Sequence, residues 1–124
     1  MKRIIAAAIL TAAVIFFYIF GYFFIDKSVK KAEKLLESCA VSYETSNNAK
    51  AQSVKLQEFW SDIEGTLSVF ANHAIIDDIE LAIGSLSIYS NTDQNEIYME
   101  YWATVKTLLH QLMEDTKPSA HSIL

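Results

Sequence analysis

An uncharged apolar segment near the N-terminus is the feature that most constrains the fold of this chain. The 22 residues from Ile4 to Ile25 contain no Asp, Glu, Lys or Arg. As an α-helix they would extend about 33 Å, which exceeds the roughly 30 Å thickness of a bilayer's hydrocarbon core. Many of their side chains are Ile, Leu, Val or Phe, and each of these favours insertion by about 0.3 to 0.6 kcal/mol. The segment therefore predicts a membrane-spanning helix within residues 1–25.

The flanks of this segment favour a permanent anchor over a cleaved signal peptide. Lys2 and Arg3 supply the basic start that both kinds of segment share. A cleaved signal has a shorter apolar stretch, of about 7–15 residues, followed by a pair of small residues at the cleavage site. Here the stretch is longer and runs through Phe23 to Lys27 without such a pair. We expect an uncleaved signal-anchor, with a cleaved signal as the alternative.

The charges around the segment give two opposite indications of orientation. Four lysines lie between residues 27 and 34, so a count of Lys and Arg places the C-terminal side in the cytoplasm. The short basic start at Lys2 and Arg3 is instead typical of a signal-anchor whose N-terminus stays inside. We favour the second arrangement, a single-pass protein of the cell membrane with the bulk of the chain outside the cytoplasm. The four lysines would then lie near anionic lipid headgroups, or simply form a solvated flank.

Composition excludes several other classes of protein. With only three glycines and one proline, the chain lacks the frequent turn signals of an all-β fold. An apolar content of 52% argues against disorder. Cys39 is the single cysteine, so neither an internal disulfide nor a zinc site made of cysteines alone is available, and we expect a small core residue at this position.

Beyond the apolar segment, apolar residues recur at helical spacing in four stretches. They cover residues 27–45, 49–71, 74–89 and 93–115. No Gly or Pro interrupts residues 22–45, so we expect the first stretch to continue the membrane helix. Aromatic side chains such as Trp60, Tyr98 and Trp102 are expected to fill the core, with Tyr98 or Tyr101 on a docking surface as the alternative.

Polar residues between these stretches mark their ends. The triplet at residues 46–48, the pair Asn72–His73 and the triplet at residues 90–92 are suited to stops and N-caps. Asn91 and Gln94 fit a variant of the capping box, and Pro118 closes the last helix.

These signals together predict an all-α fold. The N-terminal transmembrane helix would continue into a small antiparallel bundle of three to four helices, because short connections place successive helices antiparallel. We expect the last three helices to form the compact unit, since their apolar faces are the richest. The predicted divisions are an anchor at 1–25, a juxtamembrane helical stalk at 26–48, a bundle at 49–117 and a tail at 118–124.

Charge in the distal part of the chain restricts its partners. From Ala40 onward the sequence has twelve acidic residues and four basic ones. A surface with this balance repels the phosphate backbone, so nucleic acid is not expected as a partner. The lipid bilayer and another membrane protein are the partners that we expect, and the sequence does not specify an oligomeric state.

Two His–carboxylate pairs are the candidate metal ligands. His73 and Asp77 are spaced four apart, as are His110 and Glu114, so each pair would share a face of its helix. Four such ligands on two antiparallel helices would converge on one divalent ion. The competing and stronger interpretation is structural: the His73 ring caps a helix start, and the acidic residues after it oppose the helix dipole. We therefore predict no metal and no other cofactor.

No constellation for catalysis is present in the sequence. It contains neither a Gly-x-Ser-x-Gly nucleophile elbow, nor a glycine-rich phosphate loop, nor a His-Glu-x-x-His zinc motif. Cys39 has no neighbouring His in the sequence. We expect a protein that is not an enzyme.

The run from Phe59 to Glu80 resembles an uncharacterised family of short proteins from clostridial and other endospore-forming Firmicutes. In that family a Trp in one helix, here Trp60, is paired with a His-x-x-x-Asp-x-Ile-Glu pattern that opens the next helix. The matching positions are His73, Asp77 and Glu80. Pro118 matches the Pro-Ser near the C-terminus of the family, whereas the Asn that follows there is replaced by Ser122.

The resemblance covers most of the chain and implies a single N-terminal span with a helical domain. It implies no activity, because the family is a domain of unknown function. With the anchor and the acidic bundle, it predicts a membrane-anchored, non-catalytic accessory or interaction protein of a Gram-positive envelope. The alternative is a sensor-like helical bundle that binds a cation or a small molecule.

Overall fold

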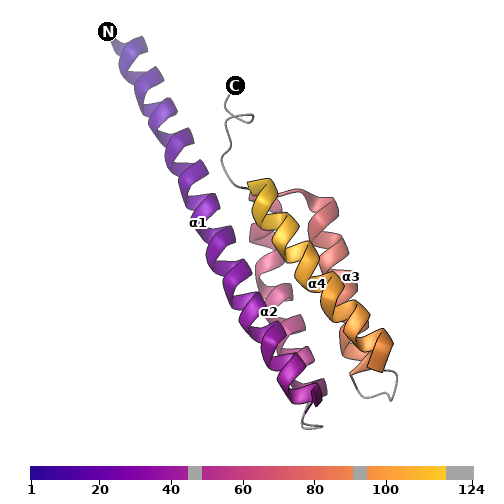
Figure 1. Cartoon of the computed structure of the whole chain (residues 1–124). Coiled ribbons are helices and arrows are strands. Elements are labelled where there is room, and N and C mark those ends of the chain that lie inside the picture. Colours follow the sequence, from indigo (N-terminus) through magenta and orange to yellow (C-terminus); the bar gives the residue numbers. More distant parts are fainter. Residues whose placement is uncertain (45–48, 91–94, 117–124) are drawn as a thin grey trace.

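The computed structural model describes residues 1–44, 49–90 and 95–116, and these residues form four α-helices. They are α1 (Lys2–Glu44), α2 (Ala49–Phe70), α3 (His73–Tyr89) and α4 (Asn95–Thr116), shown in Figure 1. The predicted all-α fold with a long apolar N-terminal helix is confirmed, and the apolar segment does continue into the next stretch without a break. The predicted polar triplet at 46–48, the capping box of Asn91 and Gln94, and Pro118 lie outside the described residues.

The four helices surround one core. α1 packs against α2 and α4, and α3 packs against the same two helices, so each helix has two neighbours. Figure 1 shows the three shorter helices alongside the second half of α1, with the first half of α1 extending past them. The arrangement is an antiparallel four-helix bundle in which α1 supplies one corner.

The two halves of α1 have different environments. Every residue up to Phe20 is exposed, whereas from Gly21 onward the helix has a buried face. That face consists of Gly21, Ile25, Ser28, Val29, Ala32, Leu36 and Cys39. Our expectation that the last three helices form the compact unit is therefore wrong, because the segment expected to be a stalk contributes core residues. Its buried positions include small Gly, Ser, Ala and Cys side chains, which give a weak hydrophobic signal in the sequence but permit close helix packing.

The first half of α1 is the one described segment that is long and apolar enough to cross a membrane. Length and composition carry this assignment, and a signal sequence at the N-terminus would share both properties. The side chains of residues 1–20 contact water in the isolated chain, although most of them are apolar. An exposed apolar surface of this size is typical of a site that contacts a membrane or another protein.

Aromatic side chains of α4 bind the backbone of α1. The Trp102 Nε1 atom donates to the Leu36 carbonyl oxygen at 2.8 Å, and the Tyr98 hydroxyl donates to the Cys39 carbonyl oxygen at 3.2 Å. Tyr98 is 0% exposed and stacks on Tyr43 with the ring centroids 3.8 Å apart. Tyr98 is thus a core residue, as expected for most of the aromatic set, and not a docking residue. Burial raises the pKa of the Tyr98 hydroxyl to about 12.

The helix ends at the α2–α3 connection are explained by local chemistry. The Asn72 side chain accepts a hydrogen bond from the Ala74 backbone N–H at 2.8 Å and so caps the start of α3. The predicted break at Asn72–His73 is confirmed, but the cap is Asn72 and not the His73 ring. The first turn of α3 contains no acidic residue, so Asp77 and its neighbours do not lie at the helix start.

Candidate functional site

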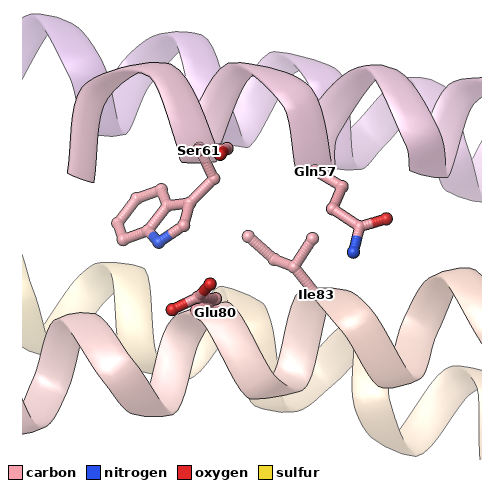
Figure 2. A pocket seen from close by; sticks show the side chains of 5 residues that line it. Gln57, Ser61, Glu80 and Ile83 are labelled. Carbon is pink, nitrogen blue, oxygen red and sulfur yellow. The ribbon is translucent and has the colours of Figure 1, made fainter. Parts of the chain in front are cut away.

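A small cavity between α2 and α3 brings together two of the residues that the family resemblance singled out. Its volume is about 100 Å³, and Figure 2 shows its lining. α2 contributes Gln57, Trp60 and Ser61, and α3 contributes Glu80 and Ile83. Ile83 forms an apolar wall, while the other residues carry polar atoms. The cavity is therefore suited to a small polar group next to an apolar surface.

The indole of Trp60 places a hydrogen-bond donor in this lining without an acceptor. Trp60 is 1% exposed, and its Nε1 atom has no partner among the described residues. The Glu80 carboxylate belongs to the lining of the same cavity. A buried donor without an acceptor costs about 1–3 kcal/mol, so native structures usually satisfy it with water or a ligand. The cavity provides the space for such an acceptor.

Carboxylates from both helices lie beside the cavity. Burial raises the pKa of the Glu64 carboxyl on α2, and repulsion from the Glu80 carboxylate and a hydrogen bond with it raise the pKa further. Asp77, about one turn before Glu80, raises the pKa of Glu64 as well. A hydrogen bond between two carboxyl groups requires one of them to hold a proton. A proton or a bound cation would relieve the same repulsion.

The raised pKa of Glu64 predicts a pH-dependent effect of the Glu64→Gln substitution. Between the ordinary carboxyl pKa near 4.5 and the higher folded value, the folded chain holds a proton that the unfolded chain has released. The stability of the native protein therefore falls as the pH rises through this window. Glu64→Gln should be more stable than the native chain at pH 7, by less than about 1 kcal/mol because exposed carboxylates are screened. Urea unfolding at pH 4 and pH 7 measures this, and a larger gain at pH 4 would contradict it.

A second prediction compares the two tryptophans. Trp102→Phe removes the hydrogen bond to the Leu36 carbonyl, a net loss of about 0.5–1.5 kcal/mol in addition to the lost volume. Trp60→Phe removes a donor that has no acceptor among the described residues, so it should destabilise the chain less, although Trp60 is the more buried residue. Urea unfolding in dialysed, metal-free buffer compares the two. A greater loss for Trp60→Phe would show that its N–H is already well satisfied, for example by ordered water.

The structure does not assemble the four candidate metal ligands. His73, Asp77, His110 and Glu114 are all exposed. Within the described ranges, no three His, Cys, Asp or Glu side chains are grouped so that they could hold a metal ion. His110 and Glu114 do meet, with 3.8 Å between Nε2 and Oε1, as an exposed pair on one helix. The convergence from two helices, which was the weaker alternative, does not form among the described residues, because these four side chains are exposed.

The family-motif positions fall into three groups. Trp60 and Glu80 line one cavity, and Asp77 acts on Glu64 beside it. His73 is the first residue of α3 and is exposed, while Pro118 lies outside the described residues. We did not single out Gln57 or Glu64 from the sequence. Their spacing of three and four residues from Trp60 places both on its side of α2, and this spacing was the available signal.

Comparison with protein families places the chain in a group without an assigned activity. A family model described as "Domain of unknown function (DUF4363)" matches residues 19–123. The match leaves out residues 1–18, which include most of the apolar segment, and the final residue. Because it covers well over half of the chain, the chain belongs to this family. No curated protein and no solved structure matches the chain. The matched region begins within the apolar segment, just before the buried face of α1.

Proposed function

We propose that this member of the DUF4363 family is a single-span membrane protein whose helical bundle binds another membrane protein and performs no catalysis. The observation that carries the proposal is the continuity of α1. One helix includes the uncharged, exposed segment and the core residues from Gly21 to Cys39. An anchor built this way fixes the bundle in place and orientation beside the membrane, which is what an accessory subunit requires.

The face formed by α3 and α4 is the surface that best fits a protein partner. Leu81 is 71% exposed, and it lines a shallow cavity of about 340 Å³ together with Tyr101 and Leu108. Ile88, two turns farther along α3, is 67% exposed. Exposed apolar side chains bordered by polar residues are typical of protein-binding surfaces. The acidic balance of the bundle disfavours nucleic acid as the partner.

The proposed location is the cell membrane of a Gram-positive bacterium, with the bundle outside the cytoplasm. The basic start at Lys2 and Arg3 supports this orientation, against the lysines that follow the span. A reporter fused after Leu124 that is active only outside the cytoplasm would support it. A reporter active only inside would overturn the orientation and leave the anchor unaffected.

Site-specific crosslinking in native membranes tests the binding function. A photoreactive residue placed at Leu81 should give a crosslinked product with one membrane protein, and the same residue at exposed Glu58 on α2 should not. Extraction with alkaline carbonate should leave the chain in the membrane pellet. No product from Leu81, or equal products from both positions, would contradict the proposed surface. A product with twice the chain's mass would identify a second copy as the partner.

The α2–α3 cavity favours a second candidate function, the binding of a cation. The cation would neutralise the Glu64 and Glu80 carboxylates. Ca²⁺ or Mn²⁺ should then raise the melting temperature of the native chain and not that of Glu80→Gln. Glu114→Gln, which alters an exposed carboxylate of α4, is the matched control. No shift with Ca²⁺, Mn²⁺ or Zn²⁺ would exclude this function.

A further inference from the structure

The last residue of α2 packs into the segment of α1 that we place in the membrane. The centroid of the Phe70 ring lies 4.8 Å from that of Phe17 and 6.0 Å from that of Phe20. Gly21 creates the space for this contact, because a Cβ atom at that position would lie 2.3 Å from the Phe70 ring. Phe70 therefore lies in a notch of α1 at the boundary between its exposed and buried halves.

The depth of this contact follows from helix geometry. Phe17 lies eight residues before Ile25, which corresponds to about 12 Å along the helix from the end of the uncharged segment. The segment is only a few ångströms longer than a hydrocarbon core, so Phe17 in a spanning helix lies below the headgroups. A ring 4.8 Å from Phe17 cannot then be in bulk water.

The chain around Phe70 has the composition that this position requires. Residues 65–76 contain no Asp, Glu, Lys or Arg. Val69, next to Phe70, is 63% exposed and has an apolar side chain directed away from the core. The α2–α3 connection lies at the end of the bundle from which the first half of α1 extends (Figure 1). The end of α1, the start of α2, the end of α3 and the start of α4 lie at the other end.

We infer that the α2–α3 corner, residues 69–73, inserts into the phospholipid interface of the leaflet from which α1 emerges. The inference rests on the proposed membrane anchor and adds a second contact with the bilayer. Burial of apolar surface at the boundary between headgroups and acyl chains provides the affinity. The bundle then stands with one end in the interface, and α1 does not hold it away from the membrane as a stalk would.

Depth measurement in vesicles tests the inference with two matched positions. Val69→Cys and Ile88→Cys each place a label at an exposed, β-branched apolar site, the first at the corner and the second near the opposite end of α3. Native Cys39 is fully buried, and a Cys39→Ala background removes it as a labelling site. The full chain is reconstituted in phosphatidylcholine–phosphatidylglycerol vesicles that contain lipids with a nitroxide near the headgroup.

The label is the environment-sensitive fluorophore NBD, attached to the introduced cysteine. At position 69 it should emit at shorter wavelength, and the nitroxide lipids should quench it at least about threefold more than at position 88. Equal quenching and water-like emission at both positions, with the protein retained after carbonate extraction, would overturn the inference and leave the anchor intact. Release of the protein by carbonate would overturn the proposed anchor, and this inference with it. Far-UV circular dichroism of both labelled chains confirms that the helices are retained.

Discussion

A chain that begins at residue 49 is expected to lose the cooperative unfolding transition of the full protein. It lacks the α1 face that covers α2 and α4, including Ile25, Val29 and Leu36, each at most 2% exposed. It also lacks the carbonyl oxygens that accept from Trp102 and Tyr98. Three helices with one side of the core open to water are not expected to offset their chain entropy. Near-UV circular dichroism during urea titration should show no sigmoidal transition.

A chain that begins at Tyr22 is the control for this truncation. It keeps nearly all of the buried face of α1 but omits the whole exposed half, residues 1–20, so it should unfold cooperatively. A point variant isolates the same effect in the full chain. Leu36→Ala should cost about 2–5 kcal/mol, whereas Leu81→Ala, at an exposed position, should change stability by less than about 0.5 kcal/mol. A cooperative transition in the chain that begins at residue 49 would contradict the four-helix core.

Gly21→Leu is expected to separate the end of the bundle from the exposed apolar half of α1. The Cβ atom of the new side chain would lie 2.3 Å from the Phe70 ring. The ring has little room to move away, because its Cγ atom, the ring carbon nearest the backbone, would lie only 2.9 Å from the same Cβ atom. Overpacking of this kind costs about 1–3 kcal/mol. Thermal unfolding in detergent micelles measures the loss. In vesicles, the same substitution should reduce the quenching of a label at position 69.

Gly65→Ala is the matched control for this substitution. A Cβ atom at Gly65 meets nothing within 4 Å, and the position is an exposed site inside α2. Replacing glycine by alanine in a helix interior should stabilise the chain by about 0.5–1 kcal/mol. Equal effects of the two substitutions would show that the Phe70 contact is absent. A destabilising effect of Gly21→Leu, without one for Gly65→Ala, would support the packing of the α2–α3 corner against α1.

Local sequence signals determined the helices of this protein. The predicted stretches 49–71 and 74–89 agree within one residue with α2 and α3. The uncharged segment and the absence of Gly and Pro in residues 22–45 determined that α1 runs on as one helix. Asn72 marks the break between α2 and α3, because its side chain accepts a hydrogen bond from the backbone N–H of Ala74, two residues later. Each of these effects acts within one or two helical turns, so periodicity and composition are enough to predict it.

The candidate site was only partly accessible from the sequence. Trp60 and Glu80 were selected through a resemblance, and no rule of spacing connects them, because they lie on different helices. Glu64 became apparent only when α2 and α3 were placed side by side, since its raised pKa depends on carboxylates of the other helix. The two His–carboxylate pairs are the opposite case, because the sequence predicted their arrangement within one helix but not where that helix turns them. Their spacing within each helix was correct, but the rotation of the helices turns them outward.

The sequence by itself determined that this protein is all-helical, where most of its helix ends lie, and that one segment has the length and composition of a membrane span. The tertiary structure alone decided that the second half of α1 belongs to the core, that Trp60 and Glu80 line one cavity, and that Phe70 packs beside Gly21. The physical reason is the range of the interactions. Helix formation and capping depend on neighbours in sequence, whereas packing depends on the register and rotation of whole helices, to which small residues such as Gly21 and Cys39 contribute shape rather than hydrophobicity.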